Sequence, residues 1–428
     1  MPMDAGALAG IRVLEFSQIV AGPFLGCILS DLGAEVVKVE RPGGDFHRNW
    51  GAVVPHEGKR FQSLNRGKRS VVVDIGQPRG REVIRQLVRG FDVVTNNFRA
   101  NIAERLGIDY ETLREARPDL IYCQISGWGM TGPMADLGAN DPVICAYSGL
   151  TVGDGKVSPE GVPQTVSCSV VADHGAGYAS AVGIVSALYH RERTGEGQRI
   201  DAALLQAALA FQPTQVMREP VEDATFRDPM VERIREARAA GRPYPAVLEA
   251  RRNSRRSEAA WRGFSRAFAT SDGVIQLGAI TPRIRDTVRR IVGIEGDRSD
   301  EPDFDVDDPA SEAFNDYRER TIAAYLAERR TAELIEEFST AGVPIAPVQA
   351  PEELSDDPQV QAAGFMAQLE HPLTGPQQVM GPVVDMSGTP TAVQGPAPLL
   401  GADSDEVLAG AGLTPAAIAS LREDGIVE

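Results

Sequence analysis

The sequence of 428 residues contains few of the residue types on which several common kinds of site depend. It has only five histidines and four cysteines, and a zinc site is normally built from these two residue types. Cys27, Cys123, Cys145 and Cys168 stand singly in apolar surroundings, with no C-x-x-C pair among them. We therefore expect buried thiols rather than disulfides, and no metal site.

Long apolar runs and an excess of positive charge are also absent. No stretch approaches the roughly 18 to 20 apolar residues that a membrane span requires, and the first ten residues, MPMDAGALAG, lack the basic and then apolar order of a signal peptide. The net charge of −17 argues against a nucleic-acid partner, which would require a positive field over much of the surface. We expect a cytoplasmic protein that binds neither membranes nor nucleic acid.

The length and composition predict a globular protein with two domains. Hydrophobic residues make up 43% of the chain and charged residues 24%, and a single core stops growing at roughly 250 to 300 residues. We expect a large domain over residues 1–212 that is completed by about 375–428, and a smaller domain over 265–345. Residues 213–264 and 346–374 are expected to link them.

Short β-branched runs alternate with helical patterns over the first 126 residues. The clearest helical pattern covers Pro78–Arg89, with proline in the first turn and Gly90 as the stop. Regular alternation of strand and helix predicts an α/β domain with a parallel sheet and helices on both faces. The predicted strands are Ile11–Phe16, Val36–Glu40, Val71–Asp74, Val93–Thr95 and Leu120–Ile125.

The turn after the first strand has the outline of a dinucleotide-binding unit, with Glu40 closing the next strand. Gly22, Gly26 and Gly33 do not form the G-x-G-x-x-G pattern of that unit, so a nicotinamide cofactor is only an alternative. A helix that begins after this turn would still present free backbone N–H groups to a phosphate-bearing ligand. An ordinary strand-to-helix turn explains the same residues.

Basic residues recur near the predicted strand ends. Because paired arginine donors match phosphate, this grouping in an acidic chain indicates a phosphorylated cofactor, although each cation alone fits a solvated surface charge. They are Arg41 before Gly43 and Gly44, Arg66, Lys68 and Arg69 before the third strand, and Arg99 and Arg105 after the fourth.

Asp173 is the main candidate for chemistry. It precedes His174-Gly175-Ala176-Gly177, at the start of a helix over His174–His190 that we expect to be buried. One interpretation is an N-cap, because aspartate is a favoured cap. The other is a carboxylate nucleophile, which at the ordinary aspartate pKa of about 3.9 is already ionised at neutral pH. We expect His174 to have a structural or surface role.

Taken together, these segments resemble the class III CoA-transferase family, which includes formyl-CoA transferase, carnitine CoA-transferase and α-methylacyl-CoA racemase. Only residues 213–270 or so resist alignment. The segments are Leu8–Phe16, Ala21-Gly22-Pro23, Leu32–Asp45, Asn65–Ser70, Asn97-Phe98-Arg99, Ser126–Gly129, Ala172-Asp173, Arg193–Gln198, Ala341–Pro344 and Pro398–Gly401.

The resemblance implies a large domain with a Rossmann-like parallel sheet, a smaller α+β domain, and an interlocked homodimer. It implies transfer of CoA from an acyl-CoA to a carboxylic acid, through an aspartyl-CoA thioester on Asp173. Coenzyme A enters as a substrate. Arg41 and Arg105 would contact its phosphates or adenine. The positions that match the family's CoA contacts are Ile19, Ala21, Arg41, Val73, Asn97, Arg99, Arg105 and Leu106.

Three departures from the family pattern bear on the activity. Racemases of the family carry a histidine where this chain has Asn140, so one of the two acid/base groups needed to move an α-proton is missing. Formyl-CoA transferase has a glutamine where this chain has Val20, and no glycine-rich flap is evident. We therefore favour CoA transfer, without oxalate or formate specificity, over a racemase-type epimerase or a CoA-binding protein without turnover.

Overall fold

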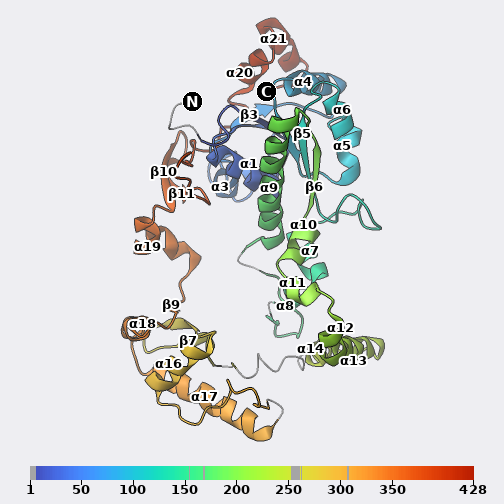
Figure 1. The fold of residues 1–428 in the computed structure, drawn as a ribbon. Helices are drawn as coiled ribbons and strands as arrows, with labels where there is room; N and C mark the ends of the chain where they lie inside the picture. The colour runs from blue at the N-terminus through green and yellow to red at the C-terminus, as the bar shows by residue number, and fades with distance from the viewer. Residues whose placement is uncertain (1–5, 154, 167–168, 252–260, 262, 306–307) are drawn as a thin grey trace. The chain divides into compact units, whose positions relative to one another are not determined.

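The chain divides into two compact units, each described here by itself (Figure 1). The first comprises Met1–Met217 with Pro358–Glu428, and the second comprises Arg218–Asp357. The computed structural model describes residues 6–153, 155–166, 169–251, 261, 263–305 and 308–428. Cys168 lies outside these residues.

A six-stranded parallel sheet organises the first unit. Its strand order is β3-β2-β1-β4-β5-β6, which is the order of a Rossmann fold and confirms the predicted fold class. The sequence did not indicate β6, because Arg199–Ala203 contains a single β-branched residue. The strands are β1 (Arg12–Glu15), β2 (Glu35–Glu40), β3 (Arg69–Val72), β4 (Val93–Asn96), β5 (Ile121–Ser126) and β6 (Arg199–Ala203).

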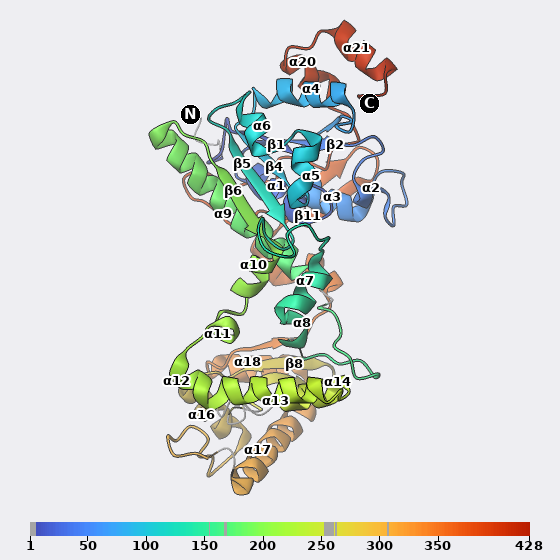
Figure 2. The same ribbon diagram turned by 90° about the vertical axis from the view of Figure 1, so that its right-hand side faces the viewer.

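Alternate residues of the strands build a separate apolar core on each face of the sheet, as the period of two in a strand requires. Val13 and Val93 face α1 (Ala21–Asp31) and α9 (Val171–Thr194). Leu14 and Val94 face the other core, which includes α4 (Pro78–Val88). Figure 2 shows the same sheet and helices turned by 90°. The remaining helices of residues 1–217 are α2 (Phe46–Asn49), α3 (Lys59–Asn65), α5 (Ala100–Leu106), α6 (Tyr110–Arg114), α7 (Asp141–Ser148), α8 (Leu150–Gly153), α10 (Leu204–Ala210) and α11 (Pro213–Val216).

Helix α9 packs closely against α1 because small residues occupy the contact. A Cβ atom on Gly177 would lie 2.9 Å from the ring of Phe24 and 3.1 Å from the carbonyl oxygen of Ala21. The expectation that this helix is fully buried is wrong. Only one face is covered, and its opposite face exposes Tyr178 and Val182, which are 44% and 68% exposed.

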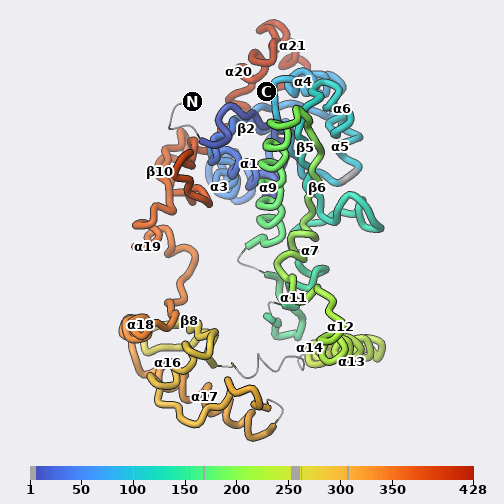
Figure 3. Tube along the Cα trace, viewed as in Figure 1, coloured from blue at the N-terminus to red at the C-terminus, as the bar shows by residue number. Residues whose placement is uncertain are grey.

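The C-terminal segment belongs to the first unit (Figure 3). Helices α20 (Ser404–Gly410) and α21 (Pro415–Glu423) pack into the same core as α4, and Val427 forms a bridge to Val73 beyond the end of β3. Before them, α19 (Pro358–Ala362) leads into a hairpin of β10 (Met366–His371) and β11 (Gly375–Met380).

The second unit has its own α+β core. An antiparallel sheet of β7 (Ser265–Ala269), β8 (Val274–Gly278) and β9 (Ile345–Pro347) packs against three helices. These are α16 (Pro282–Val292), α17 (Pro309–Ala327) and α18 (Thr331–Thr340), and the 3₁₀ turn Pro351–Asp356 follows the sheet. The segment expected as a linker also contains α12 (Pro220–Glu222), a π-helical turn at Asp223–Arg227, α13 (Asp228–Ala239) and α14 (Tyr244–Arg251). Within the described part of the chain, no helix combines the length and apolarity needed to cross a membrane.

Candidate active site

Asp173 lies in the first turn of α9, at the edge of the sheet where the strands end. Because β5 and β6 are parallel, the helix that connects them must run back against their direction, so its start lies at their carboxyl ends. The packing agrees with this position: a Cβ atom on Gly175 would touch Ala207 of α10, the helix that begins where β6 ends (Figure 1). Ligands of open α/β sheets bind at this edge.

The N-cap interpretation of Asp173 is wrong, because α9 begins three residues earlier than predicted. The N-cap residue is Val170, which has no side-chain hydrogen bond to the helix. The carboxylate of Asp141, on α7, supplies the cap instead. Its Oδ1 accepts hydrogen bonds from the backbone N–H of Ala172 at 2.7 Å and of Asp173 at 3.2 Å.

Asp141 is itself firmly placed. It is only 2% exposed, it lies at the start of α7, and its Oδ2 accepts a hydrogen bond from the thiol of Cys145 at 3.4 Å. Burial and the neighbouring Asp141 raise the pKa of Cys145 to about 12, so the thiol keeps its proton as a donor. The positive ends of two helices, α7 and α9, therefore lie at one buried carboxylate.

The carboxylate of Asp173 differs from that of Asp141 in its contacts. It makes no hydrogen bond or ion pair with any described residue, although the side chain is half-buried. Burial, and then the negative charge of Asp141, raise the pKa of Asp173 to about 7. The expectation of an ordinary aspartate pKa is therefore wrong. Both protonation states of this carboxyl group are therefore populated near neutral pH.

The two polar residues nearest in sequence to these carboxylates have structural roles. The ring of His174 contacts the backbone oxygen of Val170 at 3.0 Å and packs edge-on against Phe24, and burial lowers the pKa of His174. Asn140 caps α7 by accepting a hydrogen bond from the N–H of Val143 at 3.2 Å. Neither side chain is held as an acid or base partner for Asp173.

A pocket of about 290 Å³ opens at the carboxyl ends of β1, β2 and β3. Of the residues predicted to contact CoA, Arg41, Val73 and Leu106 line it. The full lining is Phe16, Ser17, Gln18, Lys38, Val39, Glu40, Arg41, Gly44, Asp45, Val73, Asp74, Ile75, Gly76, Phe98 and Leu106.

The other five predicted contacts lie on neighbouring elements. Ile19 is 44% exposed in the loop between β1 and α1, and Ala21 is buried at the first position of α1. The side chain of Asn97 is bound to the backbone of Gln18. Arg99 and Arg105 are exposed at the two ends of α5.

The basic residues separate into two classes. Arg41, Arg99 and Arg105 form no ion pair with any described residue, so their charges are available to a phosphate. Arg66, Lys68 and Arg69, which were predicted to belong to the same group, instead form ion pairs with carboxylates of the fold. The prediction is wrong for these three. Arg66 pairs with Asp31 at 2.8 Å, Lys68 with Glu15 at 2.9 Å, and Arg69 with Glu35 at 3.2 Å and Asp403 at 3.2 Å.

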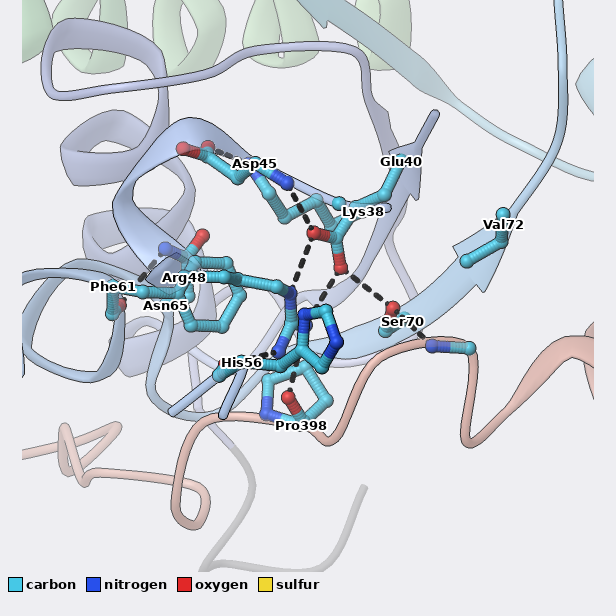
Figure 4. Close-up of polar contacts among 12 residues, drawn as sticks. Lys38, Glu40, Asp45, Arg48, His56, Phe61, Asn65, Ser70, Val72 and Pro398 are labelled. Carbon is cyan, nitrogen blue, oxygen red and sulfur yellow. Dashed lines mark hydrogen bonds and ion pairs between the residues drawn. The ribbon is translucent and has the colours of Figure 1, made fainter. Parts of the chain in front are cut away.

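Glu40 is fully engaged as well. Its two carboxylate oxygens accept hydrogen bonds at 2.7 Å from Arg48, which is completely buried, and one oxygen also accepts from Ser70 at 2.7 Å (Figure 4). In a nicotinamide-binding unit, an acidic residue after the second strand binds the ribose. Because both oxygens of Glu40 are bound by Arg48, the geometry gives the nicotinamide alternative no support.

Comparison with known proteins assigns the chain to a family. The model of CoA-transferase family III matches residues 8–404. The chain belongs to CoA-transferase family III. The succinate–glutarate CoA-transferase of Agrobacterium fabrum is 35% identical over 96% of both chains, and the succinyl-CoA:mesaconate CoA-transferase of Haloarcula marismortui is 31% identical over 95% of this chain and 97% of that one. The formyl-CoA:oxalate CoA-transferase of Rhodopseudomonas palustris is 30% identical over 98% and 97%.

Solved structures agree with the family assignment. The crystal structure of a CAIB/BAIF family protein from Brucella suis matches with a TM-score of 0.71 and 28% identity, over 95% of this chain and all of that one. A Mycobacterium tuberculosis protein matches with a TM-score of 0.72 and 27% identity, over 94% of this chain and 99% of that one. The protein is therefore a transferase of the family III type.

Sequence reasoning missed two residues that shape the site of this CoA-transferase. Asp141 was missed because its contact with the start of α9 joins residues 31 positions apart, which no local pattern shows. Asp45 follows two glycines and is the N-cap of α2, where it accepts from the N–H of His47 at 2.9 Å. The sequence Gly43-Gly44-Asp45 shows a pattern typical of a cap. It does not show that Asp45 contacts β2 and the loop after β1.

Proposed function

We propose that the protein transfers CoA from an acyl-CoA donor to a carboxylic acid through a thioester on Asp173. The observation that carries the proposal is the half-buried carboxylate of Asp173, which no described residue binds, at the ligand-binding edge of the sheet. A carboxylate can act as a nucleophile toward a thioester when it is approachable and not neutralised by a cation. Family membership supports CoA as the group that moves.

The proposed reaction balances without a further reagent. Ionised Asp173 attacks the thioester carbonyl of the donor, which gives a mixed anhydride and releases the CoA thiolate. The thiolate then attacks the aspartyl carbonyl, which releases the donor carboxylate and leaves CoA on Asp173 as a thioester. The acceptor carboxylate attacks this thioester, and the thiolate returns to the acceptor carbonyl, which regenerates Asp173.

Positioning must contribute more to the rate than the charge of the nucleophile. A helix N-terminus stabilises a nearby carboxylate by only about 0.3 to 1 kcal/mol, whereas correct alignment of two reactants contributes on the order of 7 to 11 kcal/mol. We propose that Arg41, Arg99 and Arg105, which have no ion-pair partner among the described residues, hold the CoA nucleotide. Binding energy from this distant part of CoA then aligns its thioester with Asp173.

The names of the relatives support short dicarboxylic acids as substrates. The full-length relatives are named for succinate with glutarate, for succinyl-CoA with mesaconate, and for formyl-CoA with oxalate. We propose succinyl-CoA as the donor to try first, with glutarate and mesaconate as acceptors. Oxalate and formate are predicted to be poor substrates, because Val20 stands where formyl-CoA transferase has glutamine.

We also propose a cytoplasmic homodimer. The support is the uncovered face of α9, where four apolar side chains follow helical spacing and are 41% to 68% exposed. Such a stripe on a helix is a protein interaction surface unless something covers it. The four residues are Tyr178, Val182, Val185 and Tyr189.

Trapping of the intermediate tests the proposal. The protein is incubated with succinyl-CoA, digested, and analysed by mass spectrometry for CoA on the peptide that contains Asp173. Asp173→Asn is expected to form no adduct and to transfer no CoA, and Asp405→Asn, an exposed aspartate of α20, serves as the matched control. Transfer by Asp173→Asn at the wild-type rate would rule out the proposed mechanism.

The same preparation tests the alternatives. A racemase-type epimerase would incorporate deuterium at the α-carbon of a 2-methylacyl-CoA without an acceptor acid. We expect no incorporation, because the side chain of Asn140 caps α7 and carries no titratable proton. CoA binding without an adduct or turnover over a broad acid panel would instead identify a binding protein.

A further inference from the structure

The loop between β1 and α1 contains a backbone conformation that its residue type disfavours. Ile19 has φ +71°, in the left-handed region that β-branched residues rarely enter. The loop lies beside the end of β4, at the point where the strand order reverses, and this is where Rossmann-type sheets bind their ligands. Ser17 and Gln18, directly before Ile19, line the pocket.

Asn97, which directly follows β4, binds both backbone polar groups of Gln18, the residue before Ile19. Its Oδ1 accepts a hydrogen bond from the N–H of Gln18 at 3.0 Å, and its Nδ2 donates to the carbonyl oxygen of Gln18 at 2.7 Å. Both polar atoms of the Asn97 side chain are therefore engaged with one residue of the loop.

Asp45 and Lys38 hold the neighbouring positions of the loop. The Oδ2 of Asp45 accepts a hydrogen bond from the N–H of Ile19 at 3.2 Å, and the ammonium group of Lys38 donates to the carbonyl oxygen of Ser17 at 2.6 Å. Lys38 and Asp45 are both buried and lie 3.2 Å apart as an ion pair. Three successive loop residues are thus fixed by side chains from other elements.

Asp45 is fixed in turn. Its N–H donates to Glu40 at 3.0 Å, and Glu40 is held by buried Arg48 (Figure 4). The hydrogen bond that holds Ile19 is therefore anchored in a buried polar network.

We propose that Asn97 and Asp45 are positioning residues that hold Ile19 in its left-handed conformation, and so fix one wall of the CoA site before CoA arrives. The inference rests on the proposed function, because it takes the pocket to be the CoA site. The role proposed here for Asn97 acts through the loop, because both polar atoms of its side chain hold Gln18. A loop that is already ordered loses less conformational freedom when the ligand binds, which strengthens binding.

The first experiment separates binding from turnover. Affinity for free CoA is measured by calorimetry, and kcat and KM for succinyl-CoA are measured for the wild type and Asn97→Ala. We expect Asn97→Ala to weaken CoA binding and raise KM roughly ten- to thirtyfold, which corresponds to about 1.4 to 2 kcal/mol. The kcat is expected to change less than threefold, because the side chain of Asn97 forms no hydrogen bond with any described residue of α9.

A rescue experiment tests the conformational part of the proposal. Glycine adopts positive φ readily, so Ile19→Gly is expected to restore at least half of the lost affinity, on a logarithmic scale, in the Asn97→Ala background. The matched control is His56→Gly, since His56 is the other described non-glycine residue with positive φ, at +65°. His56→Gly is not expected to restore binding.

Each outcome bears on the proposal. Unchanged CoA affinity in Asn97→Ala overturns it, as does equal rescue by His56→Gly or failure of Ile19→Gly to rescue. If Asn97→Ala does not fold, Asn97→Asp replaces it, because aspartate keeps the acceptor for the Gln18 N–H and loses the donor. A wild type that binds CoA but does not transfer it would refute the proposed function and leave this inference standing.

Discussion

Removing the charge of Asp141 is the sharpest available perturbation of the site. In Asp141→Asn, the amide oxygen can still accept the N–H bonds of Ala172 and Asp173 that cap α9. The negative charge that opposes ionisation of Asp173 is removed. The variant therefore separates the electrostatic effect of Asp141 from its capping role.

The structure sets the size of the expected effect. At about 1.36 kcal/mol for each pKa unit, the rise of the Asp173 pKa from 3.8 to about 7 corresponds to roughly 4 kcal/mol against the ionised form. Burial is the larger cause and the charge of Asp141 the smaller. Its removal should therefore return less than half of this free energy, and we expect the pKa of Asp173 to fall to roughly 5.5 to 6.5 in Asp141→Asn.

The pH dependence of kcat/KM measures this change, because it reports ionisations of the free enzyme. For the wild type, kcat/KM should rise with pH through about 7 as Asp173 ionises. In Asp141→Asn the rise should move to lower pH, while Asp141→Ala, which also loses the cap, should lose activity at every pH. A rise that stays at the wild-type pH, or moves higher, would refute the reasoning.

Three further predictions use other observations. Above pH 7, Asp173→Asn should be more stable to urea than the wild type by up to roughly 4 kcal/mol, and the difference should vanish near pH 4. The reason is that the wild-type carboxyl group binds its proton more tightly in the folded state, so the wild type loses stability as the pH rises from about 4 to 7. Arg41→Ala and Arg105→Ala should each raise KM for succinyl-CoA roughly ten- to hundredfold, since hydrogen bonds to charged groups contribute about 1.5 to 3 kcal/mol; Arg79→Ala, whose arginine pairs with Asp424, should not. Val182→Glu should dissociate a homodimer formed through α9, and light scattering that gives an unchanged mass would exclude that interface.

The pattern of elements could be predicted because it is local. Period, proline at helix starts and glycine at helix ends identified five strands and α4 within a few residues. The burial of α9 was misjudged for a physical reason. Its small residues pack tightly against α1 on one face, but exposed Tyr178 and Val182 look the same in sequence as buried apolar residues. Periodicity shows that a face is apolar, not what covers it.

The roles of the cations could not be predicted from local pattern. Arg66 and Asp31 are 35 positions apart, and Lys68 and Glu15 are 53 apart. Ion pairs between such distant residues are created only by the fold. Arg41, by contrast, precedes two glycines and forms no ion pair with any described residue, so its assignment to a ligand stays a prediction.

The two interpretations of Asp173 as a cap and as a nucleophile are incompatible in one side chain. A carboxylate that accepts backbone N–H bonds is stabilised in its ionised form, which lowers its pKa and occupies its lone pairs. Both effects make it a poorer nucleophile. In this protein Asp141 accepts the N–H bonds at the start of α9, and the carboxylate oxygens of Asp173, in the first turn of the same helix, are not bonded to any described residue. This division of roles between two carboxylates supports the proposal that Asp173, which has the raised pKa, is the nucleophile.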